Sequence, residues 1–458
     1  MQLEQKTLTA FLEAVRKLDV GFENLPAFDS WLAETDRVSE ILNEVATRLS
    51  DNYPYFHPLY AGQMLKPPHP IARLSYALAM WINPNNHALD GGRATSAMEK
   101  EAVGEIAAMF GWRDFLGHLC GGGTMANLEA LWIAGQLHTG KKILASEQAH
   151  YTHRRICGVL RLEFESVPVD SLGRMDVSAL KKLLERGDVG TVVVTMGTTA
   201  TGSVDPLANV LELREQFGFR VHADAAYGGY FTLAGNLGHH AKAAFAKIRE
   251  VDSIVIDPHK HGLQPYGCGC VLFRDASVGR LYKHDSPYTY FSSAELHLGE
   301  ISLECSRAGA AAAGLWATQK LLPLSPDGDF AHGLERGREA ALRLHEKVQN
   351  DERFITAFVP ELDILVFAPR AASLSEASAQ SRSIFTAAAK RGLHLALAEL
   401  PVSFFKERFG AMAQGSAQTV TCLRSVLMKP EHLDWVDRIW EILETAANET
   451  WTKTSQHA

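Results

Sequence analysis

The chain has 458 residues, of which 46% are hydrophobic and 21% are charged, a composition typical of a globular protein with a sizeable core. Its 53 Asp and Glu residues outnumber its 45 Lys and Arg residues, and the formal charge of −8 excludes a dedicated nucleic-acid binder. No apolar run approaches the roughly 18 residues that a membrane helix needs, and the first ten residues are too polar for a signal peptide. We therefore expect a soluble, cytoplasmic protein with no membrane or nucleic-acid partner.

The spacing of the Cys and His residues indicates whether the chain has a disulfide framework or a metal site. The six cysteines are scattered and form no C-x-x-C pair, which indicates reduced thiols rather than a disulfide or zinc framework. The 19 histidines include loose pairs but no H-E-x-x-H or other ligand spacing. We expect no metal site.

The N-terminal region has the pattern of a helical arm. Apolar residues recur at helical spacing between residues 7 and 49, with an interruption near Gly21 and Pro26. A proline-rich passage follows, from His57-Pro58 to Pro70, and its X-Pro bonds favour an extended backbone. This passage is typical of a loop that lines a site.

From about residue 100 to residue 275, short β-branched runs alternate with stretches of helical periodicity. Strands are predicted at Lys142–Ser146, Thr191–Met196, Arg220–Ala223, Ser253–Ile256 and Cys268–Phe273. Helices are predicted between them at Ala126–Gln136, Val177–Glu185, Ala208–Phe217 and Ala241–Arg249. This alternation is typical of an α/β fold, with a mostly parallel sheet covered by helices on both faces.

A second unit follows this region. A long helix is predicted over Ala331–Val348, a strand over Ile364–Phe367, and a closing amphipathic helix over His432–Thr445. We expect three parts in the chain: an N-terminal helical arm over 1–60, a large domain over 61–324, and a smaller α+β domain over 325–458.

Reactive side chains follow four of the predicted strands. In chain order these are His150, then Thr198 and Thr199, then Asp224, and finally Lys260. In an open α/β sheet, ligands bind beyond the carboxyl ends of the strands. The sequence therefore predicts that these residues share one site.

The lysine at this sheet edge suggests which cofactor is bound. A buried amine is costly unless its pKa falls or it bonds to a carbonyl, and a Schiff base between Lys260 and pyridoxal phosphate (PLP) is one such solution. Asp224 is suited to hold the pyridine nitrogen protonated. The run Cys120-Gly-Gly-Gly-Thr124 opens a helix and offers N–H groups to a phosphate, while His150 can stack on the ring.

Two longer motifs then match a known family. The stretch Val221–Gly229 and the segment Asp257-Pro-His-Lys260 resemble the PLP-dependent group II amino acid decarboxylases, which act on aromatic amino acids, glutamate, cysteine sulfinate or diaminobutyrate. The similarity continues, in the same order along the chain, at His57-Pro58, residues 122–131, Ser146–His150, Met196–Thr199 and Ser306-Arg307. It implies a fold-type-I homodimer with the active site at the subunit interface and the N-terminal arm on the partner.

The resemblance also implies roles for single residues. It implies cofactor contacts from Lys260, Asp224, His150, Gly123, Thr124, Thr198, Thr199, Ala226 and His259. Of these, Lys260, Asp224, His150 and His259 are the expected catalytic group. Either Thr198 or Thr199 would face the 3-hydroxyl side of the cofactor. Substrate contacts are expected from Gln63, Lys66, Tyr288 and Tyr290.

The expected reaction is decarboxylation of an L-amino acid to its amine and CO2. Gln63 and Lys66 suit an acidic substrate, whereas Tyr60, Trp81 and Phe291 suit an aromatic one, and both classes stay open. Residues 304–309 also resemble the sphingosine phosphate lyase branch and the archaeal tyrosine/aspartate decarboxylases. The alternative reactions are therefore carbon–carbon cleavage and aldehyde synthesis with the same cofactor.

Overall fold

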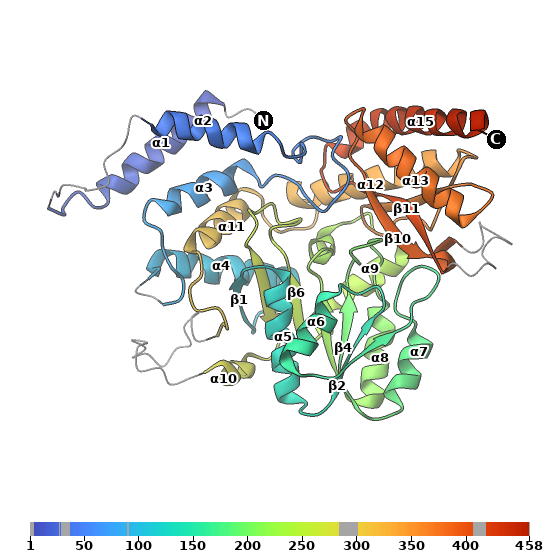
Figure 1. Cartoon of the computed structure of the whole chain (residues 1–458). Coiled ribbons are helices and arrows are strands. Elements are labelled where there is room, and N and C mark those ends of the chain that lie inside the picture. The colour runs from blue at the N-terminus through green and yellow to red at the C-terminus, as the bar shows by residue number, and fades with distance from the viewer. Residues whose placement is uncertain are drawn as a thin grey trace.

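Two β-sheets organise the computed structural model, which describes residues 4–26, 28, 37–88, 91–283, 301–405 and 418–457 (Figure 1). The larger sheet has seven strands in the order β1-β7-β6-β5-β4-β2-β3. Their bounds are β1 Leu116–Cys120, β2 Lys142–Ser146, β3 Phe164–Val167, β4 Val189–Thr195, β5 Arg220–Asp224, β6 Ser253–Ile256 and β7 Gly269–Phe273. Strands β3, β2, β4, β5 and β6 pair in parallel, and β7 is antiparallel to both β6 and β1.

Helices cover both faces of this sheet, as the sequence predicts. Ile254 of β6 and Leu272 of β7 belong to one apolar cluster, whereas their neighbours Val255 and Val271 belong to another. Because side chains alternate between the faces of a strand, the two clusters lie on opposite sides of the sheet. The helices around the sheet are α4 Arg93–Met109, α5 Gly123–Leu137, α6 Thr152–Leu160, α7 Val177–Leu184, α8 Leu207–Phe217, α9 His239–Ala246, α10 Gly279–Tyr282 and α11 Gly309–Leu321. The prediction of a mostly parallel, doubly covered sheet is confirmed.

The smaller sheet is antiparallel, in the order β10-β11-β9-β8. Its elements are α12 Asp329–Gln349, β8 Phe354–Thr356, β9 Ile364–Pro369, α13 Leu374–Ala389, β10 Ala396–Pro401, β11 Thr419–Val426 and α15 His432–His457. The proline-rich passage enters this unit, because the N–H of Ala61 donates to the carbonyl of His394 at 2.9 Å and Ala61 is fully buried in its core. The division of the chain at residues 60/61 and 324/325 stays a prediction.

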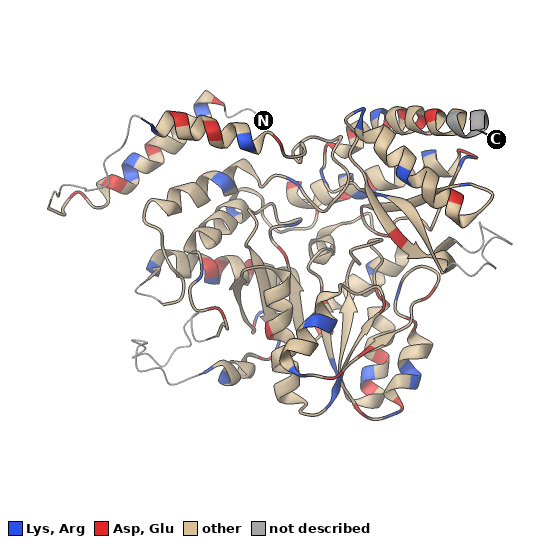
Figure 2. Ribbon diagram, in the orientation of Figure 1, with Lys and Arg blue, Asp and Glu red and all other residues tan. Residues whose placement is uncertain are grey.

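The N-terminal helices lie outside both cores. Helices α1 (Gln5–Val20) and α2 (Val38–Leu49) contain no buried residue, although they carry apolar side chains. Phe11 of α1 contacts Trp81, which follows α3 (Pro70–Met80), with ring centroids 5.7 Å apart. In Figure 1 both helices extend beyond α3, away from the large sheet, and in Figure 2 they carry Lys or Arg interspersed with Asp or Glu.

None of the helices in the described part of the chain is long and apolar enough to cross a membrane. Within the same residues, no group of three or more His, Cys, Asp or Glu side chains is arranged to hold a metal ion.

Candidate active site

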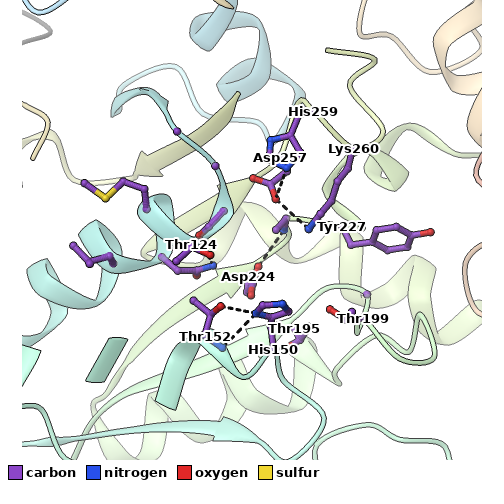
Figure 3. Close-up of a pocket in the computed structure, with 18 of the residues that line it drawn as sticks. Thr124, His150, Thr152, Thr195, Thr199, Asp224, Tyr227, Asp257, His259 and Lys260 are labelled. Atoms are coloured by element: carbon purple, nitrogen blue, oxygen red, sulfur yellow. Dashed lines mark hydrogen bonds and ion pairs between the residues drawn. The ribbon is translucent and has the colours of Figure 1, made fainter. Parts of the chain in front are cut away.

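A cavity of about 500 Å³ lies at the carboxyl ends of the parallel strands, as expected for an open α/β sheet (Figure 3). The loops after β1, β2, β4, β5 and β6 all contribute to its wall. The lining residues are Gly121, Gly122, Gly123, Thr124, Met125, Asn127, Leu128, His150, Thr152, Thr195, Gly197, Thr199, Asp224, Ala226, Tyr227, Asp257, His259, Lys260 and Glu304.

Lys260 reaches this cavity from the turn after β6. Its Nζ lies 3.0 Å from Oδ2 of Asp257, and Nε2 of His259 lies 3.5 Å from the same oxygen. The Asp257 side chain is only 3% exposed, so one buried carboxylate serves both neighbours. Burial lowers the pKa of His259. The amine is thus placed beside an acceptor for its proton.

Asp224 is the last residue of β5, with its side chain in the cavity wall. Its Oδ2 accepts a hydrogen bond from Nε2 of His153 at 2.8 Å, and its Oδ1 accepts one from the N–H of Ala226 at 3.1 Å. Burial alone would raise the pKa of Asp224, but the hydrogen bond from His153 and the nearby positive groups hold it below its usual value. The carboxylate is therefore ionised and firmly oriented.

His150 faces the same space from the turn after β2. Its Nδ1 lies 2.6 Å from Oγ1 of Thr152, and the backbone N–H of Thr152 also approaches that nitrogen at 3.3 Å. Burial lowers the pKa of His150, so the imidazole is neutral near pH 7. Figure 3 shows this ring close to Asp224, held by Thr152.

The glycine run before α5 forms a cradle for an anion. The first turn of an α-helix leaves N–H groups without a partner in the helix, and no side-chain hydrogen bond caps α5 at Gly122. Gly122 has a φ of +145°, which side chains rarely allow, and a Cβ added to Gly123 would lie 2.7 Å from Oδ2 of Asp257. A side chain at either position would therefore disturb the cavity wall, whereas the glycines leave the N–H groups at the start of α5 available to a phosphate.

These residues fit PLP. The cavity offers an amine for its aldehyde at Lys260, an ionised acceptor for its ring nitrogen at Asp224 and free helical N–H groups for its phosphate at the start of α5. Two buried wall oxygens, Oγ1 of Thr195 and Oδ1 of Asp257, also have no hydrogen-bond partner among the described residues. Such polar atoms are expected in a site that a polar group completes.

Comparison with known proteins agrees with this geometry. The model of the pyridoxal-dependent decarboxylase conserved domain matches residues 133–370, about half of the chain. The chain belongs to the pyridoxal-dependent decarboxylase family. Its cofactor is PLP, and it is a PLP-dependent carboxy-lyase, as the sequence predicts.

Several relatives are similar over most of this decarboxylase. L-tyrosine decarboxylase of Enterococcus faecium is 30% identical over 417 residues, covering 69% of this chain and 68% of that protein. A probable L-tyrosine/L-aspartate decarboxylase of Methanothermobacter thermautotrophicus is 31% identical over 317 residues, covering 67% and 82%. The crystal structures of mouse CSAD (TM-score 0.76, 19% identity, 96% and 99% coverage) and of Oryza sativa TDC with PLP and tryptamine (TM-score 0.77, 18% identity, 98% and 99% coverage) share its fold.

The decarboxylase brings together almost all of the predicted cofactor residues. Lys260, Asp224, His150, Gly123, Thr124, Thr199, Ala226 and His259 line the cavity. Thr198 does not line it: that side chain is fully buried, and its hydroxyl lies 2.8 Å from that of Thr201. Of the two threonines that sequence leaves open, Thr199 is therefore the one at the cavity.

Of the predicted substrate residues, the structure describes Gln63 and Lys66, and neither lines this cavity. Gln63 is exposed and does not line the cavity, and Lys66 lines a different one. Tyr288 and Tyr290 lie outside the described residues, as does Phe291.

Sequence reasoning gives no role to His153 or Asp257. His153 lies three residues after His150, on the first turn of α6. The His150 ring therefore lines the cavity, whereas the His153 ring lies behind Asp224 and binds its carboxylate. Asp257 directly follows β6, in the same strand-end segment that supplied Lys260. Asp257 could have been predicted from its place directly after a strand. The contact of His153 with Asp224 depends on how α6 packs, which the sequence pattern does not show.

Proposed function

We propose that this decarboxylase converts an aromatic L-amino acid to its amine and CO2, with Lys260 and Asp224 holding PLP. The observation that carries the choice of substrate is the charge of the cavity wall. Three carboxylates contribute to it, from Asp224, Asp257 and Glu304, and Lys260 is the only Lys or Arg among the described lining residues.

This wall is poorly suited to an acidic side chain. Recognition of a second carboxylate takes a fixed cation, usually an Arg or a Lys. His150 and His259 do not supply one, because burial lowers the pKa of both imidazoles. Lys260 is committed to the cofactor.

One aromatic ring, that of Tyr266, packs on a residue of the cavity wall. The Tyr266 ring lies 4.9 Å from the His259 ring, and its hydroxyl donates to the carbonyl of Met64 at 3.2 Å. Tyr55 and Tyr60 pack edge to face at 4.9 Å in the segment that enters the proline-rich passage. A flat aromatic substrate gains from contacts of this kind. The relatives named as L-tyrosine decarboxylases support the same class, whereas the name of the Methanothermobacter relative gives both L-tyrosine and L-aspartate.

The residues of the chain have distinct parts in this reaction. Bound PLP supplies an electron sink for the pair released when the carboxylate leaves. Asp224, ionised and oriented by His153, would hold the pyridine nitrogen in its protonated form. Asp257 would orient the amine of Lys260, because its Oδ2 lies 3.0 Å from Nζ. Neutral His150 would pack on the cofactor ring without adding charge, and Thr199 contributes a hydroxyl at the cavity wall.

The N-terminal helices support a homodimer. Leu12 of α1 is 47% exposed, and Ile41 and Leu42 of α2 are 49% and 62% exposed. Helices with a substantial apolar face and no core of their own are stabilised by covering that face. We propose that α1 and α2 dock on a second copy of the chain and that the substrate end of the cavity is completed there. A cytoplasmic location stays a prediction.

A panel of substrates tests this proposal. Purified holoenzyme is incubated with L-tyrosine, L-phenylalanine, L-tryptophan, L-glutamate and L-aspartate, and both CO2 and the amine are measured. We expect kcat/KM for the best aromatic substrate to exceed that for either acidic one by at least about 100-fold, since an unpaired buried carboxylate is costly. A preference for L-glutamate or L-aspartate would contradict the substrate class, and aldehyde release without CO2 would contradict the reaction.

A further inference from the structure

A second cavity, of about 270 Å³, lies where the proline-rich passage meets the start of α12 and the segment after β11. It shares no lining residue with the active-site cavity. Its polar wall includes two lysines, Lys66 from the proline-rich passage and Lys429 from the segment after β11. These positions are 363 residues apart in the sequence, so the cavity joins distant parts of the chain.

Lys429 is an unusual residue for such a place. It is only 3% exposed, and its Nζ donates to the backbone carbonyl of Tyr60 at 2.6 Å. No carboxylate of the described residues lies within ion-pair distance of it. An ammonium has three donors and is almost never buried without a counter-ion. The other contact of Lys429 is with the face of the Tyr60 ring, 5.3 Å from the centroid. The carbonyl and the ring leave this cation without an anionic partner among the described residues.

Lys66 presents a second ammonium to the same cavity. Its Nζ has one backbone acceptor, the carbonyl of Met428 at 3.3 Å, and no ion pair among the described residues. Burial lowers the pKa of Lys66 to about 8 and that of Lys429 to about 7, and the charge of Lys66 adds to the second shift. When both amines are protonated, their like charges oppose each other across a partly desolvated space, and the attraction of Glu431 does not outweigh the effect of burial.

The neighbouring acids do not neutralise this pair. Asp363 is engaged by Nε2 of His261 at 2.8 Å and by the hydroxyl of Tyr227 at 2.5 Å. Asp329 and Glu431 line the cavity but are exposed, and neither makes an ion pair with the lysines. The other titratable lining residues are His69 and His261, and burial lowers the pKa of both.

We propose that this cavity binds a small oxyanion, a carboxylate or a phosphate, which bridges the ammonium groups of Lys66 and Lys429. Such a ligand would accept hydrogen bonds from the ammonium N–H groups that do not bind the two backbone carbonyls. Its negative charge would also offset the repulsion between the lysines. Because Lys66 belongs to the proline-rich passage and Lys429 to the C-terminal unit, the bound oxyanion would stabilise the attachment of one to the other. The inference is independent of the substrate proposed above.

Thermal unfolding of the holoenzyme tests this site, since bound PLP fills the phosphate cradle at α5. Inorganic phosphate and sodium acetate are added separately, with sodium chloride at matched ionic strength as the reference. We expect phosphate or acetate to raise Tm by about 2 °C or more over chloride, because a ligand that binds only the folded state stabilises it. We expect calorimetric titration to give one oxyanion site per chain.

Three variants distinguish oxyanion binding in this cavity from a general effect of salts on stability. Lys66→Met and Lys429→Met should each weaken oxyanion binding by at least about tenfold, since each removes a charged hydrogen-bond donor. Lys182→Met, at an exposed position on α7, should leave binding unchanged. If Lys429→Met is too unstable to purify, the oxyanion affinity of Lys66→Met alone tests the proposal. Equal Tm shifts with all three salts, or oxyanion binding that survives in Lys66→Met, would overturn the proposal.

Discussion

Nε2 of His153 lies 2.8 Å from Oδ2 of Asp224, and both side chains are buried behind the active-site cavity. A carboxylate only accepts hydrogen bonds, so this nitrogen carries the proton. Nδ1 of His153 is buried and has no partner among the described residues, so the contact with Asp224 is the one polar anchor of the ring within that part of the chain. His153 therefore acts as a positioning residue for the carboxylate that we propose holds the pyridine nitrogen.

Replacing His153 should change the pH dependence of the reaction. Asp224 has a folded pKa below its usual value, so its ionised form is favoured at all pH values above that point. In His153→Leu the donor is lost while burial remains, so the pKa of Asp224 rises and the carboxylate takes up a proton at a higher pH. We expect the acid limb of kcat/KM to move to higher pH and kcat near pH 7 to fall about 10-fold to 100-fold.

His153→Gln is the matched control for this experiment, because its amide nitrogen can reach the position of Nε2. It should restore most of kcat and return the acid limb toward that of the parent enzyme. A purely structural role for His153 would lower stability in both variants without moving the acid limb.

Lys260 should be the covalent anchor of PLP. In Lys260→Ala the aldehyde has no amine to bond, so the visible absorbance of the lysine-bound cofactor should be lost and turnover should fall by several orders of magnitude. Absorbance spectra of purified protein, before and after borohydride reduction, measure the bond. Lys66→Met, in the second cavity, should retain the absorbance. A normal spectrum in Lys260→Ala would place the bond on another residue.

The glycine cradle should tolerate no side chain at residue 123. The Cβ of Gly123→Ala would lie 2.7 Å from Oδ2 of Asp257, so either the cradle or the carboxylate beside Lys260 must move. We expect the Kd for PLP to rise at least about tenfold, as measured by fluorescence titration of apoenzyme. Gly158→Ala on α6 is the control, because nothing lies within 4 Å of its added Cβ. It should leave PLP binding unchanged and, as a helical Gly-to-Ala change, slightly raise Tm.

The exposed apolar face of the N-terminal helices should govern assembly. Leu12→Asp together with Leu42→Asp should convert a dimer to a monomer in light scattering after size exclusion, and activity should fall with it. Because neither α1 nor α2 contains a buried residue, the Tm of the isolated chain should change little. Ser39→Asp, on the same helix as Leu42, adds charge without removing an apolar contact and should remain dimeric. A stable monomer of the parent enzyme would contradict the assembly.

The sequence predicts the central strands well because they are buried on both faces. The predicted bounds of β2 and β6 agree with the structure, and both strands are continuous or nearly continuous apolar runs. The sequence pattern does not predict β3 or β1, because both strands are interrupted by polar residues or glycine. β3 is an edge strand with Glu165 and Ser166 at its centre, and β1 contains Gly117 and His118. His118 is buried there by its contact with Glu129 at 2.9 Å, a long-range pairing that local pattern does not reveal.

Topology alone brings several of the predicted site residues together. Lys260, Asp224 and His150 follow parallel strands, so the sheet brings them together whatever the details of packing. Lys66 has no such constraint: its backbone follows the small unit near His394 rather than the strand ends, and its ammonium enters the second cavity. The closing helix also extends to His457 rather than Thr445, because no Pro or Gly ends it and Ala446 and Ala447 continue its buried face.

The central claim is tested most directly by following the carboxylate of an aromatic substrate. Holoenzyme is supplied with L-tyrosine labelled at the carboxyl carbon, and labelled CO2 and tyramine are measured over the same time course. We predict one CO2 for each tyramine in the parent enzyme and neither product with Lys260→Ala. Loss of substrate with an aldehyde product and no labelled CO2, or undiminished CO2 release with Lys260→Ala, would contradict the account.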